Sequence, residues 1–338
     1  MTYYLFGVTD DTSPVEYGTI GFADPYGDRA DVKAIHYGGI SMVACELDEW
    51  SLNEADKHDL LTKLLDHQKI TEQLMKKRFI LPIKFGTTVE DERTIISILS
   101  RYHTELKNGI EEMKDFVEVD VVATWDPIAE VKKIGEADDE VKKMKAKIQK
   151  LGPDKMGDAM MTIGKMLQEK LEERRTKVEK LITNSLKSHF VKDSSHERFE
   201  DRMIINNSYL LKAGDESAFF EALDKVDIKM ESSVMFKCIH PLPPHSFATV
   251  VVTKVDPHEL KDAIDLFEVT PKTTVEEIKN KNRELTKKFH PDKAGKGSSD
   301  KFEKLNKGGK LLLNLLKNAS PLEIDLKRCY LLEVQRNG

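Results

Sequence analysis

Cysteine is scarce in this sequence of 338 residues, and the three cysteines are far apart. They are Cys45, Cys238 and Cys329. Isolated cysteines argue against a disulfide framework and a cysteine-rich zinc site, and they favour a reducing compartment such as the cytoplasm. Long apolar runs are also lacking, since none approaches the ~20 residues that a membrane-spanning helix needs. The first residues lack the basic stretch of a secretory signal, so we expect no export.

Neither sign of charge dominates the sequence. The net charge is −6 although charged residues make up 33% of the chain. This mild, mixed balance is not typical of nucleic-acid binding, and we expect neither nucleic acid nor membrane as a partner. No nucleophile–base pair, metal cluster or cofactor loop stands out, which predicts a protein without a cofactor that is not an enzyme.

Alternating strand and helix patterns predict an α+β protein. We expect two ferredoxin-like α+β domains with long helical arms, followed by a small helical module and a C-terminal strand or tail. Their predicted ranges are 1–126, 127–256, 257–319 and 320–338. Within the first domain, long helices are expected over residues 53–77 and 90–114 because apolar residues recur there at helical spacing. Each of the two domains is long enough to bury a core of its own.

Two patterns in the second half predict which side chains form the core. In the strand expected over residues 117–123, small apolar residues alternate with Glu118 and Asp120, which indicates one buried face. The apolar stripe of the following helical arm contains four methionines, Met156, Met160, Met161 and Met166. Methionines can bind varied hydrophobic partners. Packing of this stripe in the helix core against the sheet is the interpretation that we favour.

The stretch Arg78 to Val89, RFILPIKFGTTV, contains no acid, cysteine or histidine. Pro82 lies inside an apolar run, where a proline normally confines a strand to the edge of a sheet. Gly86 is expected to supply a bend that other residues do not tolerate. We therefore interpret the stretch as a segment that serves packing, with a partner-binding surface as the alternative; both can hold.

This stretch resembles the signature of the gas vesicle protein F/L family (GvpF/GvpL), which carries a Leu-Pro-aliphatic-basic-Phe-Gly-Thr core. Three further segments match in the family's order: an opening strand at 3–8, a strand at 204–211, and the loop His240 to Phe247, HPLPPHSF. The signature residues implied by the resemblance are Leu81, Pro82, Phe85, Gly86, Pro243, Pro244 and Phe247.

The loop HPLPPHSF differs from the family's Gly-Pro-x-Pro-Pro-Tyr-Ser-Phe at two positions. His240 and His245 stand in place of Gly and Tyr. Two histidines that flank a turn can be metal ligands. Because no cysteine or carboxylate lies at a suitable spacing between them, we expect a structural turn and no metal site.

Residues from Pro257 onward carry a second motif. Thr274 can cap a helix that runs to Phe289, after which His290-Pro291-Asp292-Lys293 begins a loop and a second helix follows. Two antiparallel helices with His-Pro-Asp at their tip resemble a J domain, the part of DnaJ-type co-chaperones that stimulates the ATPase of Hsp70. The docking residues implied by this resemblance are His290, Pro291 and Asp292, with the basic Lys287 and Lys288 suited to an acidic partner surface.

The J-like module departs from its family in three places. Lys281-Asn282 and Gly308-Gly309 stand where J domains usually have Ala-Tyr pairs, and Glu268 replaces the Gly of the entry turn. A glycine inside a helix costs about 1 kcal/mol relative to alanine. A working co-chaperone and a module kept for docking alone therefore both stay open.

Together the resemblances imply a cytoplasmic accessory protein associated with gas vesicles. Such a protein would bind the hydrophobic major shell protein and other gas vesicle accessory proteins, with an Hsp70 as a further partner of the J-like module. An unassembled shell subunit exposes apolar edges that aggregate unless they are covered, which gives a physical reason for such a helper. A minor structural component of the vesicle wall is the alternative, and an enzyme is a third class.

Overall fold

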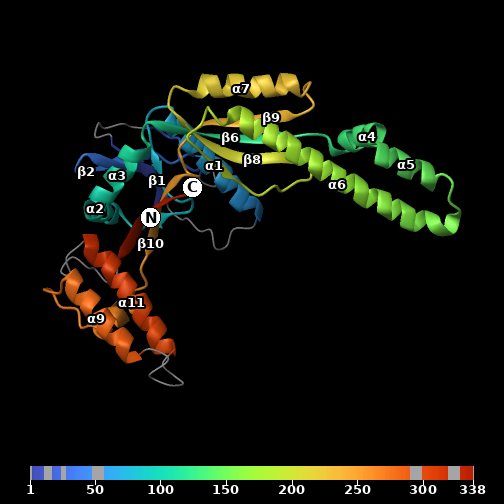
Figure 1. The fold of residues 1–338 in the computed structure, drawn as a ribbon. Coiled ribbons are helices and arrows are strands. Elements are labelled where there is room, and N and C mark those ends of the chain that lie inside the picture. Colours follow the sequence, from blue (N-terminus) through green and yellow to red (C-terminus); the bar gives the residue numbers. More distant parts are fainter. Residues whose placement is uncertain are drawn as a thin grey trace. The chain divides into compact units, whose positions relative to one another are not determined.

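The computed structural model describes residues 2–10, 17–23, 28–47, 57–289, 299–318 and 328–337. Helices and strands are mixed along the chain, which confirms the predicted α+β class (Figure 1). The chain forms two compact units. The first unit comprises Met1–Lys114 and Ala248–Arg336, and the second comprises Asp115–Phe247 with the last two residues. Within the described residues, no helix has the length and apolar character needed to cross a membrane.

The limits of these units differ from the predicted ranges 1–126 and 127–256. Strand β6 (Phe116–Thr124) was expected in the first domain but pairs with strands of the second unit. Strand β10 (Ala248–Lys254) was expected in the second domain but pairs with β11 (Tyr330–Arg336) in the first unit. Strand pairing therefore decides to which unit each segment belongs, and the helical module at 257–319 lies between two paired strands of one sheet.

The first unit is built on an antiparallel sheet in the order β2-β3-β1-β4, with β5 also paired to β1. These strands are β1 (Thr2–Thr9), β2 (Val32–Tyr37), β3 (Ile40–Leu47), β4 (Leu81–Pro82) and β5 (Thr88–Val89). A parallel bridge from Ile83 to Val250 connects the chain after β4 with β10. The described residues between β1 and β2 form isolated bridges, and the assignment of this unit as ferredoxin-like stays a prediction.

Three helices accompany this sheet: α1 (Lys57–Met75), α2 (Glu92–Arg101) and α3 (His103–Met113). The helix expected over 90–114 is thus two helices, because the backbone leaves helical geometry at Tyr102 (φ −106°, ψ 19°). Asp91 caps α2 by accepting a hydrogen bond from the backbone N–H of Thr94 at 2.9 Å. Leu99 and Leu106 are buried with Leu5 and Val334 in one core cluster. Strand β11 therefore shares the core of the first unit.

Gly7 in β1 lies against the backbone of β4. A Cβ atom at this position would lie 2.1 Å from Ile80 Cγ2 and 2.7 Å from the carbonyl oxygen of Leu81. We expect Gly7→Ala to lower the free energy of unfolding by about 1–3 kcal/mol, the usual cost of overpacking, because the β4 backbone cannot move away freely. Urea unfolding followed by circular dichroism measures the change. Gly164→Ala is the control, since open space surrounds Gly164 in a helix. A Gly7→Ala protein as stable as Gly164→Ala would contradict this packing.

The second unit contains a four-stranded antiparallel sheet in the order β7-β8-β6-β9. Its other strands are β7 (Lys192–Ser195), β8 (Met203–Lys212) and β9 (Met235–Leu242). One core cluster joins apolar residues of β6 and β8 to the end of helix α6 (Pro153–Leu186) and to α7 (Glu216–Lys229). Those helices follow β6 and β8 in the chain. The assignment of this unit as ferredoxin-like stays a prediction.

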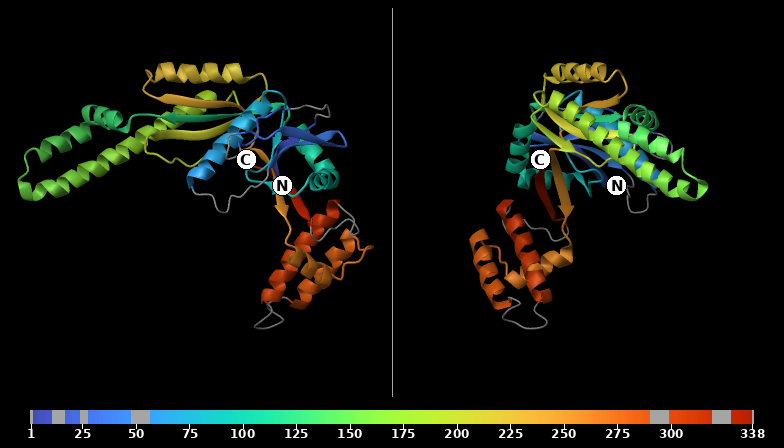
Figure 2. Two further views of the ribbon diagram at one scale, coloured as in Figure 1. Left: turned by 180° about the vertical axis from the view of Figure 1, so that it is seen from behind. Right: turned by 45° about the vertical axis from the view of Figure 1, so that its right-hand side comes forward.

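Helices α4 (Pro127–Ala137) and α5 (Asp139–Ile148) pack along the first part of α6 and form with it the long arm seen in Figures 1 and 2. Ile163 of α6 is buried with Val141 and Ile148 of α5. The methionine stripe does not follow this contact. Met156, Met160 and Met161 are 43%, 56% and 65% exposed, so the favoured core interpretation is wrong for these three. Only Met166 packs, partly buried, against the α5–α6 cluster.

The segment between β10 and β11 forms the helices α8 (Pro257–Phe267), α9 (Val275–Phe289) and α11 (Ser299–Asn318). Thr274 and Glu277 form a reciprocal capping box at the start of α9, as the sequence predicts for Thr274. Gly308 and Gly309 are buried where α11 contacts the other two helices. A Cβ at Gly309 would lie 2.8 Å from Asn282 Oδ1 and 3.1 Å from Phe267 Cζ. Close helix packing thus accounts for these glycines.

Candidate functional site

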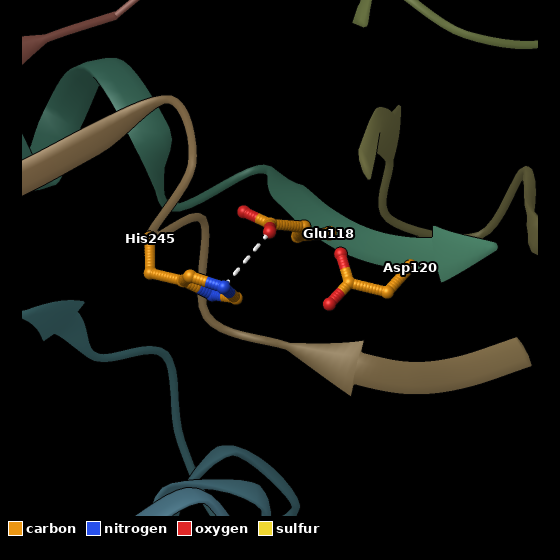
Figure 3. A group of neighbouring side chains, drawn as sticks. All are labelled: Glu118, Asp120 and His245. Carbon is orange, nitrogen blue, oxygen red and sulfur yellow. Dashed lines mark ion pairs between the residues drawn. The ribbon is translucent and has the colours of Figure 1, made fainter. Parts of the chain in front are cut away.

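The loop that follows β9 closes over the first half of β6, and this contact is the candidate site (Figure 3). Pro243, Pro244 and Phe247 of the loop are buried, whereas His245 is exposed. Two prolines restrict the backbone before His245 and Ser246, so these two residues are presented in a fixed arrangement. Their polar atoms face Glu118 of β6.

Glu118 is completely buried. Its Oε2 accepts a hydrogen bond from the backbone N–H of Ser246 at 2.9 Å, and its Oε1 accepts one from Ser246 Oγ at 2.7 Å. The Nε2 atom of His245 lies 3.3 Å from Glu118 Oε1. The alternation in β6 predicts that the valines form one buried face. Glu118 lies on the opposite face of the strand, and it is nevertheless buried. The loop covers Glu118, and Ser246 of the loop is hydrogen-bonded to the carboxylate.

A second carboxylate, Asp120, follows on the same strand. Its Oδ1 accepts a hydrogen bond from Ser208 Oγ of β8 at 2.5 Å. His196 Nε2 is 2.7 Å from the same hydroxyl, and Ser246 Oγ is 3.1 Å from it. Asp120 is opposite Ser208 in the β6–β8 register, which explains the contact. The polar network therefore extends from the loop across the sheet.

The electrostatics of the site favour an additional positive charge. The pKa of Glu118 is raised to about 7, mainly by burial and also by the charge of Asp120, although His245 and the hydrogen bonds from Ser246 lower it. Among the described residues, no lysine or arginine forms an ion pair with Glu118 or Asp120. Ligand atoms of Glu118, Asp120 and His245 all lie within 4.8 Å of one another. The arrangement can hold an extra proton or a cation.

The sequence points to a structural turn at His245 and gives no indication that Glu118 and Asp120 lie beside it. The spacing of nearby residues cannot indicate these carboxylates, because they come from a strand more than a hundred residues earlier. His240 takes no part in this cluster, and its ring lies 4.6 Å from that of Phe220. The one signal in the sequence was a pair of acidic residues inside a strand pattern, and the structure shows that this strand pairs on both sides.

The other signature residues form a packing site in the first unit. Leu81 and Pro82 make up β4 and pair with Val8 and Gly7. Gly86 adopts a positive φ of 81°, which agrees with the predicted bend, and its N–H donates to Tyr4 Oη at 3.0 Å. The Phe85 ring lies 5.3 Å from His67, whose Nδ1 is 2.9 Å from Tyr4 Oη. The two groups of signature residues thus belong to different compact units.

The residues implied for docking lie in or after α9. Lys287 and Lys288 are exposed at the end of this helix. His290, Pro291 and Asp292 lie outside the described residues. Their docking role stays a prediction.

Comparison with known proteins identifies one family. The family model for "Gas vesicle synthesis protein GvpL/GvpF" matches residues 2–249, well over half of the chain. Gas vesicle protein F from Nostoc sp. is 23% identical over 55% of this chain and 77% of its own length. Gas vesicle protein F1 from Halobacterium salinarum is 20% identical over 65% of this chain and 82% of its own length. The helical module and β11 lie beyond the matched residues.

Solved structures show the same fold. The gas vesicle protein GvpF from Anabaena sp. aligns with a TM-score of 0.57 at 21% identity, over 72% of this chain and 97% of that protein. GvpF from Microcystis aeruginosa aligns with a TM-score of 0.53 at 17% identity, over 72% of this chain and 98% of that protein.

Proposed function

Because the chain belongs to the gas vesicle synthesis protein GvpL/GvpF family, we propose that it is an accessory protein that binds the hydrophobic major shell protein and assists vesicle assembly. Its role in this proposal is non-enzymatic and cytoplasmic. Cys45, Cys238 and Cys329 form no disulfide with one another, which fits a reducing compartment. Other gas vesicle accessory proteins are further partners in the proposal.

The observation that carries this proposal is a row of exposed leucines on α1, which we name the leucine face. It consists of Leu60, Leu61, Leu64 and Leu65, which are 41%, 56%, 44% and 47% exposed. Residues at this spacing lie on one side of a helix. Ile70 and Leu74, near the end of the helix, are buried and fix α1 to its unit. The first half of α1 is thereby held with its apolar side chains accessible.

Contiguous exposed apolar surface is uncommon on soluble proteins and often marks a site of interaction. A hydrophobic shell subunit that has not yet assembled presents apolar surface that aggregates in water. Contact with the leucine face removes apolar area from water on both partners, at roughly 25 cal/mol per Å². The charged residues Asp59, Lys63 and Asp66 alternate with the leucines along the first half of α1.

The test is light scattering of freshly diluted shell subunit with and without the full chain. We expect an equimolar amount of the chain to reduce the scattering severalfold, because covered subunits do not aggregate. A folded protein of similar charge serves as the control. If the chain leaves the scattering unchanged, subunit binding is wrong. A stoichiometric amount of the chain in extensively washed vesicles would then favour the wall component.

The helical module is the second part of the proposal. We propose that it docks an Hsp70 or another assembly protein through His290, Pro291 and Asp292, with Lys287 and Lys288 beside them. The exposed lysines at the end of α9 support an acidic partner surface. ATP hydrolysis by an Hsp70 measures docking. We expect stimulation by the full chain and its loss in His290→Gln; equal rates with both proteins would contradict a co-chaperone role.

A further inference from the structure

His245 has an acceptor at each of its two ring nitrogens. Its Nδ1 lies 3.1 Å from the carbonyl oxygen of Pro243, and its Nε2 lies 3.3 Å from Glu118 Oε1. A carbonyl oxygen can only accept, so the Nδ1 atom carries a hydrogen. In the neutral imidazole the Nε2 atom then presents a lone pair to a carboxylate oxygen. The Nε2 lone pair and the carboxylate oxygen repel each other at this distance unless a proton or a metal cation lies between them.

Asp120 adds a second carboxylate to the site, which increases the repulsion that a cation would relieve. Its carboxylate lies beside that of Glu118 on the same strand, and ligand atoms of all three residues are within 4.8 Å of one another. No lysine or arginine in the described part of the chain pairs with either acid. One imidazole nitrogen and two carboxylate oxygens form a donor set that binds zinc and other divalent transition metals.

Hydrogen bonds from neighbouring groups hold the three side chains in position, as is usual for metal ligands. Ser246 donates two hydrogen bonds to Glu118, and Ser208 donates one to Asp120. His245 donates from Nδ1 to a backbone carbonyl, which directs Nε2 toward Glu118. Such outer hydrogen bonds fix the tautomer of a metal-binding histidine and the position of its carboxylates.

The cluster is also accessible from one side. The side chain of Glu118 is 0% exposed, whereas that of His245 is 47% exposed. A cation can therefore approach past the imidazole while the buried carboxylate forms the base of the site. The loop and β6 would then be joined by metal–ligand bonds as well as by hydrogen bonds.

We propose that Glu118, Asp120 and His245 bind one divalent cation, that zinc is the preferred metal, and that the ion ties the loop at 243–247 to β6. This site is independent of the leucine face and goes beyond the proposed accessory role. It departs from the expectation of a purely structural turn at His245.

Isothermal titration of the full chain with ZnCl₂ tests the proposal, after treatment with a chelator and removal of any histidine tag. We expect one ion per chain and at least about tenfold weaker binding in His245→Ala and in Asp120→Asn, since each loses a ligand. His258→Ala is the matched control, because His258 is exposed on α8 and outside the cluster; it should bind zinc like the unaltered chain. Circular dichroism confirms that all variants are folded.

Two results would overturn the proposal. One is the absence of zinc binding at millimolar metal, which would assign the position between His245 and Glu118 to a proton. The other is equal affinity in the unaltered chain, His245→Ala and Asp120→Asn, which would place the ion elsewhere, for example at a cysteine. Failure of this site leaves the light-scattering test of the accessory role unaffected, because the leucine face lies in the first unit.

Discussion

Replacing Leu81 with alanine should lower the free energy of unfolding by about 2–5 kcal/mol, the range for removing a large apolar side chain from a core. Leu81 is completely buried. In β4 it pairs with Val8, and its Cδ2 lies only 2.9 Å from the place where a Cβ of Gly109 in α3 would be. Leucine at this signature position thus fills the space between the sheet and α3, and alanine leaves a cavity there.

Urea unfolding followed by circular dichroism measures this loss, and Leu61→Ala provides the matched control. Leu61 is 56% exposed on the leucine face, so its truncation should change the free energy of unfolding by no more than about 0.5 kcal/mol. The same chemical change is thereby compared in a buried and an exposed position. Similar losses in the two variants would show that Leu81 does not act through core packing.

Replacing the four residues of the leucine face with glutamine should abolish most of the protection of the shell subunit from aggregation. Glutamine keeps the helix propensity of leucine within a few tenths of a kcal/mol. The variant therefore retains α1, which Ile70 and Leu74 anchor, and loses the apolar contact area. We expect the scattering of diluted shell subunit to return close to the level seen without the chain.

The control for this result changes exposed apolar residues elsewhere. In the variant Met156→Gln, Met160→Gln, Met161→Gln, three exposed methionines of α6 become polar while α1 is unaltered. This protein should protect the shell subunit like the unaltered chain. Loss of protection in the methionine variant alone would move the binding surface from α1 to the helical arm.

Local features of the fold followed from the sequence. Thr274 caps α9 and Phe289 ends it, and Gly86 forms the bend that its position indicated. These features depend on residues that are near one another in the chain. The leucines of α1 also have helical spacing, but spacing alone does not reveal whether a partner element covers them. The four leucines at 60–65 are exposed, whereas Ile70 and Leu74 are buried.

Long-range contacts could not be predicted in the same way. Lys254 pairs with Tyr330 across the whole helical module, so the limits of the first unit depend on a pairing between distant segments. Glu118 shows the same principle at the candidate site. Its burial depends on Ser246, which lies 128 positions later in the chain, and no local pattern connects the two.

Site-specific photo-crosslinking from α1 tests the central claim most directly. A photoreactive amino acid replaces Leu64 in one protein and the exposed Ile96 of α2 in another, and both are irradiated in cells that assemble gas vesicles. The proposed contact predicts a crosslink to the major shell protein from position 64 and little or none from position 96. Equal crosslinking from both positions, or none from position 64, would contradict binding of the shell subunit by the leucine face.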